Sequence, residues 1–235
     1  TKAVITVALF GGAPNLQEIR RICDNNNLIL IEDNAECFLG EINNKLVGTF
    51  GDFASYSFQS SKHLTAGEGG ILLCRDVGHA NRVRSIQSLG YIGLTAKKAK
   101  ITKDDIQNPT FSRHGSLGWN YRMPELCCAV ALAQVERITE LVGHRKKVGA
   151  LFDEASKDFE GDIIQKQRVY PSNENTMWTW AAKLKCESVS WSDFREHYID
   201  LGGDAFYAAW KLSYNEPMFQ SLNFLGREKF ISKSN

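Results

Sequence analysis

Two apolar runs separated by a helical pattern constrain the fold of this chain more than any other feature. Residues 2–10 and residues 28–31 are each short enough for a buried strand. Between them, Asn15 can cap a helix, and Glu18 lies three residues later, as in a capping box. A strand, a helix and a strand in this order predict a parallel βαβ unit in a doubly wound α/β sheet.

Two carboxylates end the second apolar run. Glu32 and Asp33 directly follow residues 28–31. Open α/β sheets bind ligands at the carboxyl ends of their parallel strands. We therefore predict that Asp33 lies at a ligand site, where its carboxylate could pair with a protonated ring nitrogen.

A lysine lies in the loop between two further predicted strands, residues 53–58 and 71–74. Lys62 is surrounded by serines, and Gly67, Gly69 and Gly70 predict a tight turn before the second strand. An amine held between apolar elements would be partly desolvated, which favours the neutral form needed for carbonyl chemistry. On these residues alone, a solvated loop lysine is the more common explanation.

Four motifs together resemble the DegT/DnrJ/EryC1/StrS family. In order they are residues 32–36 (EDNAE), 48–52 (GTFGD), 57–70 (SFQSSKHLTAGEGG) and 117–123 (LGWNYRM), and the resemblance covers roughly residues 1–150. It implies a pyridoxal-phosphate (PLP) sugar aminotransferase with the α/β type I aminotransferase fold. The expected parts are a partial large-domain sheet in residues 1–142 and an incomplete small α+β C-terminal domain in residues 143–235.

The resemblance also implies roles for five residues. Lys62 would be the catalytic lysine, which forms a Schiff base with PLP. Asp33 would pair with the pyridinium nitrogen, Glu36 would lie near the ring hydroxyl, and Ser57 would bind the phosphate. Asn120 would reach the cofactor phosphate of a neighbouring subunit, so a homodimer with shared active sites is expected. For Glu36, an exposed loop carboxylate stays open as an alternative.

The implied activity is transamination of a nucleotide-linked keto sugar, with an amino acid, usually glutamate in the family, as donor. One alternative is a truncated or non-catalytic PLP-binding or regulatory protein, because roughly the first hundred residues of a family member, including its phosphate-binding turn, have no counterpart here. A second alternative is the sugar dehydratase branch of the family, in which histidine replaces the lysine. Lys62 disfavours that branch, and we interpret the adjacent His63 as a structural histidine.

Composition excludes several other classes of function. Twenty-eight Lys and Arg residues against 27 Asp and Glu leave a formal net charge of +1, so we expect no nucleic-acid or membrane-surface partner. No apolar run approaches the roughly 20 residues of a membrane span. The six cysteines show no metal-ligand spacing, so no metal site is predicted, and they indicate a reducing compartment such as the cytoplasm.

The remaining elements are predicted from periodicity and from helix-breaking residues. Helices are expected over residues 76–89, from Pro124 onward and over residues 192–201, and a strand over residues 176–184. Gly143 and Gly149 are expected to weaken the long helix and to mark the domain boundary. The aromatic-rich segment 202–210 is typical of either a substrate wall or a core.

Overall fold

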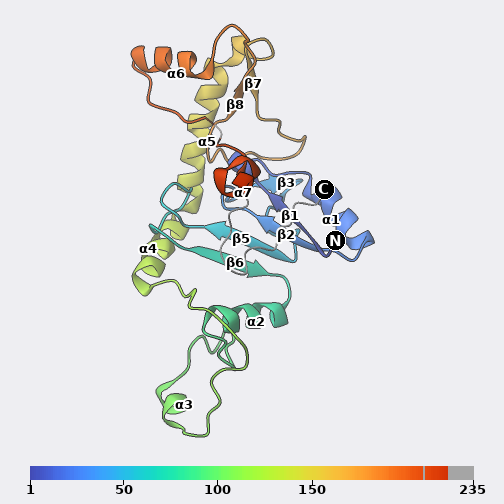
Figure 1. Ribbon diagram of the computed structural model, residues 1–235, viewed down its shortest axis with the longest axis vertical. Helices are drawn as coiled ribbons and strands as arrows, with labels where there is room; N and C mark the ends of the chain where they lie inside the picture. The colour runs from blue at the N-terminus through green and yellow to red at the C-terminus, as the bar shows by residue number, and fades with distance from the viewer. Residues whose placement is uncertain (209, 222–235) are drawn as a thin grey trace. The chain divides into compact units, whose positions relative to one another are not determined.

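The computed structural model describes residues 1–208 and 210–221 (Figure 1). The chain forms two compact units, residues 1–183 and 184–235. The strands are β1 (Ala3–Val7), β2 (Ile29–Asp33), β3 (Glu41–Ile42), β4 (Lys45–Leu46), β5 (Phe53–Ser57), β6 (Gly70–Cys74), β7 (Ile164–Lys166) and β8 (Ala182–Leu184). The α-helices are α1 (Leu16–Asn25), α2 (Val77–Gln87), α3 (Lys103–Gln107), α4 (Glu125–Glu136), α5 (Ile138–Ala155), α6 (Trp191–Asp200) and α7 (Pro217–Ser221), and the 3-10 helices are η1 (Leu9–Gly11), η2 (Lys157–Phe159) and η3 (Ser213–Asn215).

The central sheet has four strands in the order β1-β2-β5-β6. Strands β1, β2 and β5 are parallel, and β6 runs antiparallel to β5; Figure 1 shows the four arrows side by side. The register places Asp33 between Val7 of β1 and Ser55 of β5. This arrangement confirms the predicted strand, helix and strand over residues 2–33, and Asp33 is the last residue of its strand.

Side-chain caps fix the first turns of two helices. Asn15 precedes α1, and its side chain accepts a hydrogen bond from the backbone N–H of Glu18, as predicted. Asp76 does the same for α2 by accepting from the N–H of His79. The sequence therefore determines where both helices begin.

Two buried apolar clusters hold this first unit together. The first joins α1 to β2 and the loops after it, and the second joins the loop after β5 to α4 and α5. Their most enclosed large side chains are Leu16 and Leu30 in the first cluster and Leu64 in the second. Burying a side chain of this size contributes about 1.5–3 kcal/mol. The second cluster places α5 against the loop that carries Lys62.

The long helical stretch after Pro124 differs from its prediction in one respect. It is divided at Arg137 into α4 and α5, and α5 continues through Gly143 and Gly149. Gly149 is needed for packing, because a Cβ at this position would lie 2.6 Å from the Cγ of Met177. The glycines therefore do not end the helix. That residues 143–235 form the family's small domain stays a prediction.

The strand predicted over residues 176–184 is wrong for most of its length. Only Ala182–Leu184 forms a strand, which pairs with β7. Upstream, the backbone of Thr176 bonds across the molecule: its N–H donates to the carbonyl of Gly11, and its carbonyl accepts from His63. Met177 has a φ of 53°, which no strand tolerates. This segment therefore crosses the core instead of pairing with a neighbouring strand.

The second unit contains the predicted helix of residues 192–201, observed as α6. Ser190 caps this helix in a capping box with Asp193.

Phe206, in the aromatic-rich segment after α6, packs against the rings of Trp191, Phe194 and Tyr198. The aromatic-rich segment is only partly core, because Tyr207 and Trp210 are each 90% exposed. Residues 209 and 222–235, which belong to the predicted small domain, lie outside the described residues.

No helix in the described part of the chain combines the length and the apolar character needed to cross a membrane.

Candidate functional site

The two carboxylates at the end of β2 have different surroundings. Successive side chains of a strand point to opposite faces. Glu32 is fully buried, and its carboxylate accepts N–H hydrogen bonds from Gly48 (2.6 Å), Phe50 (2.8 Å) and Gly51. Glu32 therefore anchors the loop of residues 48–51, which belongs to the second of the four motifs. This role of Glu32 was not predicted from the sequence, although the motif's glycines were a signal for a close backbone approach.

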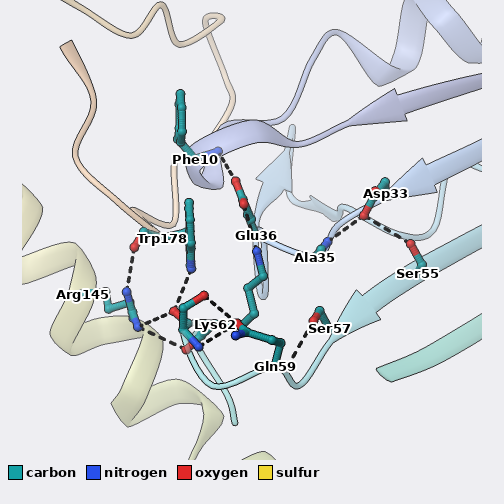
Figure 2. A network of polar contacts seen from close by, with 11 residues as sticks. Phe10, Asp33, Ala35, Glu36, Ser55, Ser57, Gln59, Lys62, Arg145 and Trp178 are labelled. Atoms are coloured by element: carbon teal, nitrogen blue, oxygen red, sulfur yellow. Dashed lines mark hydrogen bonds and ion pairs between the residues drawn. The ribbon is translucent and has the colours of Figure 1, made fainter. Parts of the chain in front are cut away.

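Asp33 occupies the other face of β2 (Figure 2). Its Oδ1 accepts hydrogen bonds from the backbone N–H of Ala35 at 3.1 Å and from the hydroxyl of Ser55 at 3.3 Å. Within residues 1–208 and 210–221, no hydrogen bond reaches Oδ2. The carboxylate is thus fixed through one oxygen and keeps the other for a ligand. Ser55 was not predicted, although its place in β5 opposite Asp33 follows from the register.

Ser57 is the last residue of β5, two positions beyond Ser55. Residues two apart in a strand share a face, so Ser57 lies on the same face of β5 as Ser55. The strand register puts Ser55 directly opposite Asp33, and Ser57 lies two positions beyond it. The Ser57 Oγ accepts the N–H of Gln59 at 3.2 Å, which leaves its hydroxyl proton for another acceptor. The predicted contact with a phosphate stays a prediction.

Lys62 and Glu36 are joined by an ion pair at the centre of the site. Lys62 Nζ lies 2.9 Å from Glu36 Oε1, and each side chain is only 15% exposed. The second oxygen of Glu36, Oε2, accepts the backbone N–H of Phe10 at 2.9 Å. Neither side chain is thus a solvated surface charge. The amine is shielded from solvent, as predicted, but a carboxylate accompanies it.

An aromatic ring and a guanidinium complete the surroundings of Lys62, and the sequence analysis predicted neither. The ring of Trp178 lies 4.3 Å from Lys62 Nζ (Figure 2). Arg145 on α5 donates to the carbonyls of Ser61, Lys62 and Trp178. Burial lowers the pKa of Arg145 from its ordinary value. These residues lie too far from Lys62 in the sequence for motif spacing to reveal them.

His63, the next residue after Lys62, is buried in the core. Its side chain is 5% exposed, and Nε2 lies 3.0 Å from the carbonyl oxygen of Thr176. Because a carbonyl only accepts, Nε2 carries the proton. Burial lowers the pKa of His63 to about 4, even though the bond to Thr176 favours the charged form. The ring is therefore neutral at neutral pH, which agrees with its interpretation as a structural histidine.

Asn120, the fifth predicted residue, has different contact partners from the residues around Lys62. It is exposed in the segment between α3 and α4, where it forms an isolated bridge with Ser88. Its Oδ1 accepts a hydrogen bond of 2.9 Å from Arg122 Nε. The contact with a neighbouring subunit stays a prediction.

The chemistry of the assembled groups fits PLP. Lys62 would provide a shielded amine for an aldehyde, and Asp33 would provide a carboxylate oxygen for a ring nitrogen. Ser57 would provide a hydroxyl donor for a phosphate oxygen. These are the functions that the protein must supply to such a cofactor.

Comparisons with known proteins identify the family of the chain. The DegT/DnrJ/EryC1/StrS aminotransferase family matches residues 1–228. A GDP-perosamine synthase from Escherichia coli O157:H7 is 30% identical over 200 residues, which cover 85% of this chain and 50% of that protein. A GDP-4-keto-6-deoxy-D-mannose 3-dehydratase from Escherichia coli O55:H7 is 32% identical over 169 residues, covering 71% of this chain and 44% of that protein.

A solved structure is similar over the same region. It is an E. coli GDP-4-keto-6-deoxy-D-mannose-3-dehydratase with bound hydrated PLP, 25% identical, with a TM-score of 0.72 over 86% of this chain and 52% of that one. The chain thus spans about half the length of the relatives it matches. The predicted α/β fold of the type I aminotransferases is confirmed.

Proposed function

Because this chain belongs to the DegT/DnrJ/EryC1/StrS aminotransferase family of PLP-dependent enzymes, we propose that it transfers an amino group from an amino acid, glutamate, to a keto sugar carried by a nucleotide. The observation that carries this proposal is the shielded amine of Lys62, held 2.9 Å from Glu36. A shielded amine fits a lysine that bonds to a cofactor aldehyde. The names of the GDP-sugar relatives support the substrate class.

Each side chain of the site has a separate part in this proposal. When bound, PLP supplies an electron sink for the carbon that loses a proton. Lys62 holds the cofactor through Nζ and moves the proton at that atom. Asp33 keeps the ring nitrogen protonated through Oδ2, while Ser57 binds the phosphate. Glu36 holds the Lys62 amine through its ion pair and would lie near the ring hydroxyl of the bound cofactor.

A homodimer and a cytoplasmic location belong to the same proposal. Asn120 is exposed and its Oδ1 is oriented by Arg122, which suits a contact with a second subunit. The six cysteines are all free, which suits a reducing compartment. An equilibrium sedimentation experiment tests the assembly, and Asn120→Ala should weaken PLP binding only if the site is shared between subunits.

Sugar dehydration is the second candidate, because a dehydratase relative is 32% identical. The family resemblance places histidine at the lysine position in that branch, whereas Lys62 stands here. Lysine supports transamination, in which the amine must return to the cofactor after each turnover. The two reactions differ in product: one adds an amine to the sugar, and the other removes a hydroxyl from it.

Borohydride reduction in the presence of PLP is the first experiment. Peptide mass spectrometry should find a phosphopyridoxyl group on Lys62, and Lys62→Ala should abolish it. Lys157→Ala is the matched control, because Lys157 is a well-exposed lysine of the same unit. An adduct confined to exposed lysines would contradict the proposed site and would favour a protein without catalytic function.

Product analysis is the second experiment. With PLP, glutamate and a GDP-linked 4-keto sugar, we expect 2-oxoglutarate and an amino sugar in equal amounts. A sugar that has lost a hydroxyl would show the dehydratase instead. Multiple-turnover transamination by Lys62→Ala would contradict the role given to this lysine.

A further inference from the structure

The indole of Trp178 covers the amine of Lys62 although the two residues come from distant parts of the chain. Lys62 Nζ lies 4.3 Å from the centre of the indole ring. An ammonium group over an aromatic face is attracted by the ring quadrupole, most strongly for tryptophan. The ring therefore faces the same atom that Glu36 contacts from another side (Figure 2).

Hydrogen bonds fix the ring to the loop that carries the lysine. Trp178 Nε1 donates to the carbonyl of Ser61 at 2.9 Å. Arg145 donates to the carbonyl of Trp178 at 2.7 Å and to those of Ser61 and Lys62 at 3.2 and 3.1 Å. The Arg145 guanidinium thus connects the backbone of the lysine loop to the backbone of Trp178. The indole cannot turn away from Lys62 without breaking its own bond to Ser61.

Phe10 connects this ring to the carboxylate. Its ring stacks on that of Trp178, with centroids 6.4 Å apart and planes within 3°, and its N–H donates to Glu36. Phe10 has a φ of 58°, a left-handed conformation that a bulky residue adopts only when its surroundings require it. Phe10 therefore contacts both the carboxylate and the indole that lie next to the amine.

We propose that Trp178 is a positioning residue that holds the Lys62 amine beside Glu36 whenever Lys62 is not bonded to the cofactor. The role rests on the proposed function, in which this amine leaves the cofactor and returns to it in every turnover. The ring limits the volume that the flexible lysine side chain can explore. It thereby shortens the search for the bonding position.

The test is the chemical reactivity of Lys62 in PLP-free protein. The protein is acetylated briefly at one fixed pH, and the modified fraction of each lysine is measured by peptide mass spectrometry. Trp178→Leu should raise the rate at Lys62 about threefold to tenfold, because the ring that shields and attracts the amine is gone. Trp178→Phe keeps an aromatic face and should restore most of the protection.

Trp180→Leu is the matched control. Trp180 lies two residues away, stacks on Phe152 and donates to Asp153, so its loss removes similar packing without touching Lys62. Lys62 should react at the wild-type rate in this variant. If Trp178→Leu does not fold, Trp178→Met keeps the bulk without the aromatic face. An unchanged rate at Lys62 in Trp178→Leu or Trp178→Met, or an equal increase in Trp180→Leu, would overturn the proposal.

A parallel experiment separates this proposal from the proposed function. With PLP and borohydride, Trp178→Leu should form the Lys62 adduct more slowly than wild type at the same PLP concentration. If wild-type protein forms no adduct, the proposed function fails, whereas the acetylation result still decides whether Trp178 holds the amine.

Discussion

Glu36 and Lys62 form an ion pair of 2.9 Å between side chains that are each 15% exposed, although 26 residues separate them in the sequence. An ion pair of this kind is expensive to break on one side only, because the remaining charge stays shielded from water. It therefore links the stability of the fold to the chemistry of the site.

Glu36→Gln should lower the free energy of unfolding by about 1–3 kcal/mol, because the Lys62 ammonium loses its carboxylate while the amide can still accept from Phe10. Urea unfolding measures the change. In a double-mutant cycle with Lys62→Met, the two losses should be less than additive. Fully additive losses would show that the interaction between the two side chains contributes nothing to the free energy of unfolding.

Glu32→Gln should destabilise the loop of residues 48–51. The amide cannot accept three backbone N–H bonds as the carboxylate does, and its own NH₂ would face a donor. We expect a loss of about 2–4 kcal/mol in the free energy of unfolding. Hydrogen exchange at Gly48, Phe50 and Gly51 should accelerate, and unchanged exchange at these amides would contradict the anchoring role.

His63 should make stability depend on pH. Burial lowers its pKa from 6.5 to about 4, so between these values the unfolded chain binds a proton that the folded chain does not. Stability from this group is complete above about pH 6.5, falls as the pH drops toward 4, and changes by about 3 kcal/mol in total.

Urea unfolding at pH 7.5 and pH 5 measures this dependence. His63→Gln can still donate to Thr176 but does not titrate, so its stability should vary less across that interval. The exposed His79 provides the control, and His79→Gln should keep the wild-type dependence. Identical pH profiles for wild type and His63→Gln would contradict the assignment.

Asp33→Asn should weaken PLP binding about tenfold to a hundredfold, because a charged hydrogen bond to the ring nitrogen becomes a neutral one. The hydrogen bonds from Ala35 and Ser55 can persist on the amide oxygen, so folding should change little. Absorbance titration with PLP measures the affinity. Asp104→Asn, an exposed change on α3, is the control, and equal affinities in both variants would remove Asp33 from the site.

The sequence by itself determined the parts of this protein that depend on neighbouring residues. The apolar runs and the Asn15 cap predicted the βαβ unit, because strand and helix periodicity are local properties. The four motifs predicted Asp33, Glu36 and Lys62 as site residues, and of these Glu36 and Lys62 form an ion pair through the loops after β2 and β5.

Only the tertiary structure decided which groups surround these residues. Glu32 and Asp33 are adjacent carboxylates on opposite faces of β2, and the packing of the loop of residues 48–51 onto one face decided that Glu32 is the buried one. Trp178 lies 117 residues from its partner Ser61, in a segment predicted as a strand. Sequence spacing carries no information about such contacts, because they form only when the packing of α5 and the core brings distant segments together.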